Sequence, residues 1–203
     1  MEKTKPHIIP SVYLAHYLDE FEEMIKSYGV SKRTVEKGTY LTQYGVINNT
    51  AHFIKKGIIH LSLGHDKGKK SLNMFGAGTI FPIGVEIHEF RVEYEMIIQA
   101  LTDVECYEIP YPTLKKIAME HGDFAGELLR ENCDFIGYMF FDSINQTFEP
   151  CLARICDILY LYLTKVPPMS EKIPLSISSH LYLQLTNKQN LNIKNRLFSL
   201  DHM

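Results

Sequence analysis

The stretch AHFIKKGIIHLSLGHDKGKKSLNMFGAGTIF, residues 51–81, says more about the fold than any other part of the sequence. Short runs rich in β-branched and aromatic residues alternate in it with glycines, which is typical of strands joined by tight turns. The segment GHDKG, residues 64–68, predicts a hairpin turn between the strands IIHLSL and KKSLNMF. Ile58, His60 and Ser62 alternate with aliphatic neighbours, so we expect this strand to have one wet face and one buried face.

The same glycine-punctuated pattern extends in both directions, from Val30 to Pro110. Several short strands at this spacing predict an antiparallel sandwich or barrel. In front of this region, residues 11–28 carry apolar side chains at helical spacing, with Ser11 as a capping residue and Gly29 as a stop. We therefore expect an amphipathic helix before the first strand.

After Pro110 the apolar spacing becomes that of helices. It predicts a short helix over 113–122, a long helix without proline over 123–146, and a third helix over 151–164 that starts after Pro150. Two adjacent prolines at 167 and 168 predict a loop, and two short helices are expected over 178–185 and 190–200.

The long helix carries a seven-residue repeat that suits packing against another helix. Leu129, Ile136 and Ser143 recur at this interval, and Cys133 and Phe140 occupy the alternate positions. We interpret Leu129, Cys133, Ile136 and Phe140 as the seam of a homodimer. The alternative is an ordinary helix packed within one chain.

Composition restricts the class of protein. The 203 residues are 45% hydrophobic, which excludes a disordered chain, and the net charge of −3 argues against a globally basic nucleic-acid coat. Neither a signal-like N-terminus nor an apolar run of 18 residues occurs, so a cytoplasmic protein without membrane contact is expected. The four cysteines are expected to be free thiols that act as small buried hydrophobes; a redox or metal role for Cys151 and Cys156 is the alternative.

No catalytic motif is present, so we do not expect an enzyme. Glu86 and His88 are the nearest approach to a metal cluster, but no third ligand accompanies them, and a solvated loop is the better interpretation. No metal site is predicted.

The order of these elements resembles that of the CRP/FNR family of transcription regulators. The resemblance rests on EKGTYL, FIKKGIIHLSL, LNMFGAGTIF, QALTDVECYEIP, ARICDILYLYL and IPLS at 173–176. It implies an α+β fold: an N-terminal helix and an antiparallel β-roll of the double-stranded β-helix or jelly-roll type over 1–115, and a dimerisation helix over 116–147. A C-terminal helical domain over 148–203 resembles an incomplete winged helix-turn-helix. The implied function is an effector-responsive, DNA-binding transcription regulator that acts as a homodimer.

The ligand of the β-roll is expected to differ from that of the cyclic-nucleotide-binding members. Those members use a Gly-Glu pair and an Arg-Ser/Thr pair, whereas here the corresponding segments read TIFPIGVEIH and VEYEMIIQA. Carboxylates at Glu93 and Glu95 would repel a cyclic phosphate. The resemblance instead suggests a small organic effector, with no cofactor, in an apolar pocket lined by Phe75, Ile80, Phe81, Ile83, Met96, Ile98, Phe135, Ile136 and Met139. The alternative is that these side chains simply fill the roll. No cysteine precedes Cys106, so an iron–sulfur centre of the family type is not expected.

The segment LTNKQNLNIKNRLFSL, residues 185–200, lies where the family has its recognition helix. The resemblance places its polar face in the DNA major groove, where Asn and Gln suit adenine and Lys and Arg suit phosphates. The residues expected at promoter half-sites are Lys188, Gln189, Asn190, Asn192, Lys194, Asn195 and Arg196. The family's wing would begin after about residue 201, so the alternative is a ligand-binding dimeric sensor whose truncated DNA-binding domain no longer reads DNA.

Overall fold

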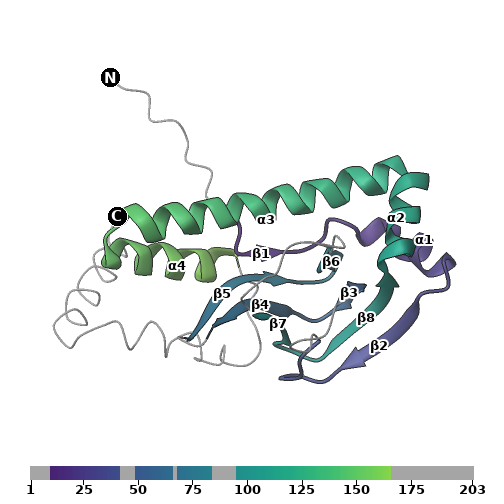
Figure 1. Ribbon diagram of the computed structural model, residues 1–203, viewed down its shortest axis with the longest axis horizontal. Helices are drawn as coiled ribbons and strands as arrows, with labels where there is room; N and C mark the ends of the chain where they lie inside the picture. The colour runs from purple at the N-terminus through teal and green to yellow at the C-terminus, as the bar shows by residue number, and fades with distance from the viewer. Residues whose placement is uncertain (1–9, 42–48, 66–67, 84–94, 166–203) are drawn as a thin grey trace. The chain divides into compact units, whose positions relative to one another are not determined.

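Two four-stranded sheets make up the β part of the residues that the structure, a computed structural model, describes: 10–41, 49–65, 68–83 and 95–165 (Figure 1). Sheet A has the order β1-β5-β4-β7, with β1 at Tyr13–Leu14, β5 at Gly68–Phe75, β4 at Ile59–His65 and β7 at Glu95–Ala100. Sheet B has the order β2-β8-β3-β6, with β2 at Ser31–Val35, β8 at Val104–Pro110, β3 at Thr50–Lys56 and β6 at Thr79–Phe81. All pairings are antiparallel except that of β1 with β5, which is parallel.

The sequence between Ala51 and Phe81 folds as predicted. Strands β4 and β5 form a hairpin in which His65 pairs with Gly68, so the predicted turn is confirmed. The turn from β3 to β4 needs Gly57, whose φ is +94° and whose missing side chain leaves room for the backbone carbonyl of Asp103.

The two sheets face each other across a shared apolar core. The inner cluster combines side chains of sheet A with side chains of sheet B; its buried members are Leu14, Val35, Leu41, Ile54, Ile59, Leu61, Leu72, Phe75, Phe81, Ile98, Ala100, Val104 and Cys106. Alternate residues of sheet B, such as Phe53 and Tyr107, instead belong to an outer cluster with the helices. The predicted antiparallel β-roll is therefore confirmed, with a core between its sheets and a second core outside sheet B.

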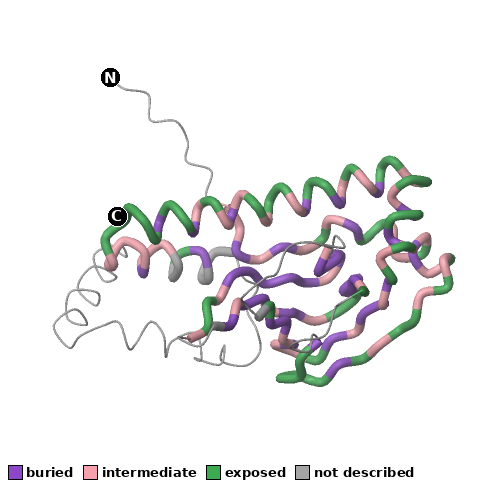
Figure 2. Tube along the Cα trace, viewed as in Figure 1, coloured by how far each residue is buried: buried purple, intermediate pink, exposed green. Residues whose placement is uncertain are grey.

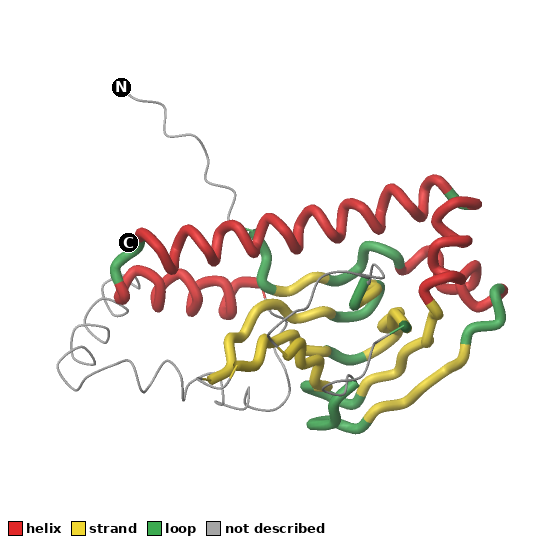
Figure 3. Tube along the Cα trace, in the orientation of Figure 1, coloured by secondary structure: helices red, strands yellow, loops and turns green. Residues whose placement is uncertain are grey.

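Helices cover the outer face of sheet B (Figure 3). The outer cluster includes Ile25 of α1 (Glu22–Ser27), Leu114 and Ile117 of α2 (Tyr111–Glu120), and Phe124 and Leu128 of α3 (Gly122–Phe148). The ends of α2 and α3 lie within about two residues of the predicted ends, whereas α1 is much shorter than the helix predicted before the first strand. The α+β class is confirmed.

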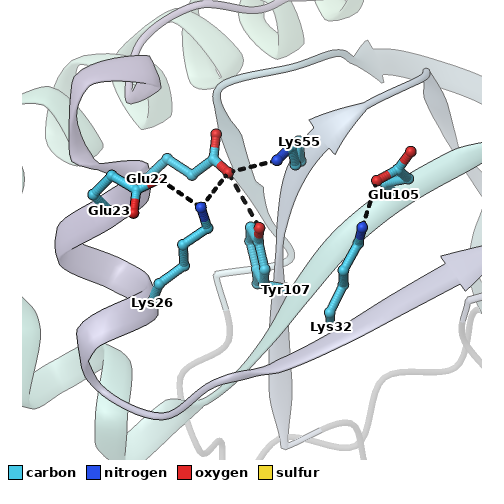
Figure 4. Close-up of polar contacts among 7 residues, drawn as sticks. All are labelled: Glu22, Glu23, Lys26, Lys32, Lys55, Glu105 and Tyr107. Atoms are coloured by element: carbon cyan, nitrogen blue, oxygen red, sulfur yellow. Dashed lines mark hydrogen bonds and ion pairs between the residues drawn. The ribbon is translucent and has the colours of Figure 1, made fainter.

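A polar network fastens α1 to sheet B (Figure 4). The carboxylate of Glu22 accepts from Lys55 of β3 at 3.0 Å, from Lys26 at 3.1 Å and from Tyr107 of β8 at 3.1 Å. The hydrogen bond from Lys55, together with those from Lys26 and Tyr107, lowers the pKa of the Glu22 carboxyl. A helix of six residues is marginal alone, so this network and the outer cluster hold it in place.

The helix predicted over residues 11–28 is wrong in its first half. Residues 13–14 form β1, a short 3₁₀ turn follows at Asp19–Phe21, and the α-helix covers only Glu22–Ser27 before Gly29, whose φ is +71°. The backbone carbonyls of Val12 and Leu14 accept hydrogen bonds from the amides of Met74 and Gly76. Pairing with β5 therefore overrides the helical spacing of this segment.

The prediction of a wet face on β4 is also wrong. Ser62 is buried, and His60 is half-buried with its Nε2 at 2.7 Å from the hydroxyl of Ser71. Burial lowers the pKa of His60 to about 4, so the imidazole is neutral at physiological pH. The imidazole of His60 therefore pairs with a side chain of the neighbouring strand β5 rather than with bulk water.

The contacts divide the chain into two compact units, Met1–Asp142 and Ser143–Met203. In the second unit the structure describes the end of α3 and helix α4, Cys151–Lys165, which confirms the third predicted helix. There the amide of Asn145 donates to Asp157 at 3.3 Å. The helices predicted over 178–185 and 190–200 lie outside the described residues. Among the helices of the described ranges, none has the length and apolar character needed to cross a membrane.

Candidate functional site

The candidate site lies where α3 meets the open side of the β-roll. Strand β6 is an edge of sheet B and β1 is an edge of sheet A, and α3 runs along these edges (Figure 1). The side chains that α3 directs toward the roll recur at intervals of three and four residues, as one helical face requires: Phe124, Leu128, Glu131, Phe135, Met139 and Asp142.

Three aromatic rings join α3 to both sheets. Phe75 of β5 and Phe81 of β6 stack with their centroids 4.1 Å apart, and the ring of Phe135 lies 5.8 Å from each of them. Phe75 and Phe81 are buried, and Phe135 is half-buried. A movement of α3 would therefore separate an aromatic contact that both sheets share.

A buried acidic side chain lies next to these rings. Both carboxylate oxygens of Glu131 are 3.2 Å from the amide nitrogen of Ile80, which lies on the edge strand β6. Burial raises the pKa of Glu131 to about 8, and the hydrogen bond from Ile80 offsets only part of that rise. Glu131 thus satisfies an edge-strand donor that has no partner strand on that side.

Two further polar contacts fix α3 along the roll. The hydroxyl of Tyr17, just after β1, donates to Asp134 at 2.6 Å, and burial together with this bond raises the pKa of Tyr17. The ammonium of Lys70 on β5 lies 2.6 Å from the carboxylate of Asp142. Both of these contacts are on the side of sheet A, and the contact of Glu131 with Ile80 connects the same helix to sheet B.

The structure brings together five of the nine predicted pocket residues. Phe75, Phe81 and Ile98 lie in the inner cluster, and Phe135 and Met139 pack against it. The other four lie elsewhere: Ile80 and Ile83 pack in the outer cluster, and Met96 and Ile136 are exposed. Phe75, Phe81 and Ile98 are all buried, so in this conformation these three side chains fill the roll, as the alternative interpretation expected.

The predicted seam residues lie on the face of α3 that points away from the roll. Leu129, Ile136 and Phe140 are 64%, 49% and 66% exposed, and Cys133 is exposed as well. Exposed and buried positions alternate along α3 in Figure 2. One helix therefore carries a face packed on the roll and an uncovered apolar face.

The cysteines do not behave alike. Cys106 is buried, and burial raises its pKa to about 11, as expected for an inert core thiol. Cys133 is exposed, which contradicts the expectation that all four are buried, and Cys151 and Cys156 are half-buried. Within the described ranges no group of three His, Cys, Asp or Glu side chains could hold a metal ion, and Glu86 and His88 lie outside those ranges.

Sequence reasoning missed two buried polar residues of this region, Glu131 and Asn73. An acidic residue at a core position of the α3 repeat is the signal that could have revealed Glu131. Asn73 interrupts the apolar run LNMF of β5 in the same way. The DNA-binding residues predicted between 188 and 196, and Glu93, lie outside the described residues.

Comparison with known proteins agrees with this geometry. Residues 32–121 match the family model of the cyclic nucleotide-binding domain, and no curated protein sequence matches the chain. The chain is similar to the solved structure of OCPA-complexed CprK, at 13% identity over 75% of this chain and 69% of that chain, with a TM-score of 0.60.

Two further solved structures give similar values. A mutant of CooA from Carboxydothermus hydrogenoformans has 17% identity over 76% of this chain and 65% of its own, with a TM-score of 0.58. CLP from Xanthomonas campestris, described as a c-di-GMP responsive global regulator, has 16% identity over 74% and 76%, with a TM-score of 0.61. The β-roll, with its cyclic nucleotide-binding domain match, and the long helix α3 together have the fold of the CRP/FNR-type regulators.

Proposed function

We propose that this chain is an effector-responsive, DNA-binding transcription regulator of the CRP/FNR type that acts as a homodimer. Its similarity to CprK, CooA and CLP supports a regulator rather than an enzyme. One of these is described as responding to c-di-GMP, and another was solved with OCPA bound. The ligands of those proteins do not identify the effector of this chain, which has to be inferred from the residues of this chain.

The observation that carries the proposal is the two-faced character of α3. Its inward face packs Phe135 against Phe75 and Phe81, while its outward face exposes Leu129, Ile136 and other apolar side chains. An exposed apolar stripe at seven-residue spacing is unfavourable in water and suits a second copy of the same helix. The helix that closes the roll is therefore also the helix that pairs two subunits.

A switch follows from this arrangement. An effector that binds between the roll and α3 competes with Phe135 and Met139 for the inner cluster. It favours whichever placement of α3 it contacts better, and this difference in affinity is the energy that shifts the equilibrium. Because the seam lies on the same helix, the two C-terminal units change their relative placement, and with it the spacing of the half-sites that they fit.

The effector is not a cyclic nucleotide in this proposal. A cyclic phosphate needs a cation that can bind it bidentately, and the sequence offers Glu93, Tyr94 and Glu95 at that place. We expect cyclic AMP and cyclic GMP at millimolar concentration to leave the melting temperature unchanged. A saturable rise in melting temperature with either one would contradict this part of the proposal.

The dimer is tested by analytical ultracentrifugation of the wild type and the Ile136→Asp variant. A charge in the centre of the seam should produce a monomer, whereas Lys116→Gln on the exposed side of α2 changes the net charge by the same one unit and should remain dimeric. A wild-type chain that is monomeric at micromolar concentration would contradict the proposal.

DNA binding is tested by fluorescence anisotropy with DNA from the gene's own upstream region, random competitor DNA and two salt concentrations. Binding that survives the competitor and is lost in a Lys194→Glu/Arg196→Glu double variant supports the regulator. Binding that vanishes with salt or competitor reflects phosphate contacts alone. That outcome would favour the alternative, a ligand-binding dimeric sensor that no longer reads DNA.

A further inference from the structure

Asn73 of β5 is a buried polar side chain without a hydrogen-bonding partner among the described residues. Its exposed fraction is 0%, and both the oxygen and the nitrogen of its carboxamide lack a bond there. A buried amide that is left unpaired costs stability comparable to a lost hydrogen bond. Such a group needs an explanation, and a missing ligand is one.

The backbone of β5 directs Asn73 toward the interior of the roll. The register between β4 and β5 shifts at this point: His60 pairs with Met74, and Ser62 pairs with Ser71. Two residues of β5, Leu72 and Asn73, therefore lie opposite the single residue Leu61, as in a β-bulge.

The apolar residues around Asn73 on β4 and β5 belong to the inner cluster. Leu61 and Leu72 are buried in it, and so is Phe75, which lies two residues further along the strand and hence on the same face as Asn73. Asn73 thus lies two residues before Phe75 on the same face of β5, and the ring of Phe75 contacts both Phe81 and Phe135 of α3.

We propose that Asn73 is the polar recognition group of the effector site, an inference that rests on the effector-responsive function proposed above. A carboxamide offers one acceptor and one donor group side by side, so it pairs best with a ligand that has a donor next to an acceptor. The ligand class is a small, uncharged, mostly apolar ring compound with such an edge, for example a cyclic amide. Apolar walls with a few placed polar groups are typical of sites for ligands of this kind.

The surroundings disfavour an anionic ligand. The hydrophobic residues that form the inner cluster contribute no cation, and the carboxyl of Glu131, which α3 directs toward the roll, would add repulsion if ionised. The ammonium of Lys70 at the other end of β5 is engaged with Asp142 at 2.6 Å. An anion would lose its hydration there without gaining a counter-charge.

Entry of the ligand is linked to α3. Phe135 and Met139 pack against the inner cluster from this helix and are only half-buried, so they are the side chains that can give way. A ligand bonded to Asn73 takes their place against Phe75 and Leu61. Binding at Asn73 and displacement of the helix are then the same event.

The test uses 2-pyridone, a ring with an N–H beside a C=O, as the probe of the full chain in calorimetric titration and thermal melting. N-methyl-2-pyridone lacks the donor, and benzoate is the anionic counterpart. The variant is Asn73→Leu, which keeps the branching and the number of side-chain heavy atoms and removes both polar atoms. Ser71→Ala, whose hydroxyl bonds to His60 on the other side of the same strand, is the matched control.

We expect 2-pyridone to raise the melting temperature of the wild type and of Ser71→Ala, with N-methyl-2-pyridone and benzoate weaker by about tenfold or more in affinity. Asn73→Leu should lose this response by a similar factor while melting no lower than the wild type without ligand. No response of the wild type, or equal responses of the wild type and Asn73→Leu, would overturn the inference. A clear fall in the melting temperature of ligand-free Asn73→Leu would also overturn it, because the amide would then be satisfied in the folded protein.

Failure of this inference is distinguishable from failure of the proposed function, because DNA binding is measured on the same samples by anisotropy. Specific DNA binding without an Asn73-dependent response overturns the inference alone. An Asn73-dependent response in a chain that binds DNA only non-specifically supports the inference and contradicts the regulator.

Discussion

Both carboxylate oxygens of Glu131 lie 3.2 Å from the backbone nitrogen of Ile80, so an acidic side chain of α3 completes the hydrogen bonding of the edge strand β6. Its pKa rises from 4.5 to about 8 because the group is buried. The folded protein therefore holds a proton that the unfolded chain releases above pH 4.5. This group makes the free energy of unfolding fall as the pH rises from about 4.5 to about 8.

Replacement of Glu131 by Gln should raise the free energy of unfolding at pH 8 by on the order of 2–4 kcal/mol, because Gln is never ionised. At pH 5 the gain should nearly disappear. Urea denaturation at the two pH values measures both quantities. Glu131→Ala is the control: it leaves the amide of Ile80 unpaired and should lower stability by about 1–3 kcal/mol at both. A Gln variant no more stable than the wild type at pH 8 would show that the buried carboxyl is already ionised there.

His60 should have the opposite pH dependence. Its pKa falls from 6.5 to about 4 on burial, so the folded state excludes a proton that the unfolded chain accepts. The stability it contributes is complete above pH 6.5 and is lost as the pH falls toward 4, by up to about 3 kcal/mol. The difference between wild type and His60→Gln, followed by urea denaturation from pH 7.5 to 4.5, isolates this contribution.

Ser71→Ala separates the hydrogen bond of His60 from its titration. It removes the 2.7 Å contact and should lower stability by roughly 0.5–1.5 kcal/mol, with little change of the loss between pH 6.5 and 4. If His60→Gln retains the full wild-type dependence on pH, the acid sensitivity arises from other groups.

Phe135 and Phe140 provide a matched pair on opposite faces of α3. Phe135→Ala removes a ring 5.8 Å from both Phe75 and Phe81 and should lower the free energy of unfolding by about 2–3 kcal/mol. Phe140 is 66% exposed, so Phe140→Ala should change the stability of the single chain by less than about 0.5 kcal/mol and should weaken self-association instead. Denaturation at low protein concentration and sedimentation equilibrium separate the two effects. Equal loss of stability in both variants would contradict this division of the helix.

Gly57 and Gly38 test the backbone of the roll. Both have positive φ, +94° and +85°, but a side chain at Gly57 would meet the carbonyl of Asp103, whereas the space at Gly38 is open. Gly57→Ala should therefore lower the free energy of unfolding by more than about 2 kcal/mol, and Gly38→Ala by about 1 kcal/mol. Thermal unfolding of the two variants in parallel is sufficient, and a Gly57→Ala protein as stable as Gly38→Ala would contradict the packing of this turn.

The sequence predicted the roll well because its strands are bounded by local signals. The turn at residues 64–68 and the glycine at 57 are readable without knowledge of distant residues. It failed for residues 13–14 because their partners, Met74 and Phe75, lie about sixty positions away, and helical spacing in an isolated segment says nothing about such pairing.

The site was only half predictable for a similar reason. Heptad spacing groups Leu129, Ile136 and Phe140, which are all exposed, but the family resemblance also assigned Ile136 to a pocket from which it points away. Ile80 and Phe81 are adjacent on β6 and must face opposite sides of the sheet, so only Phe81 reaches the inner cluster. Asn73 and Glu131 became visible only when burial and hydrogen bonds were known.

The parallel pairing of β1 with β5 has a consequence for biosynthesis. Residues 13–14 leave the ribosome long before Met74 and Phe75, and the other wall of their final position, α3, begins only at Gly122. Strand β1 therefore remains unpaired while the local β4–β5 hairpin forms, since a hairpin closes faster than the long loop between β1 and β5. The N-terminal strand is thus among the first segments synthesised and among the last to dock, a delay during which the free edge of β5 is open to other chains.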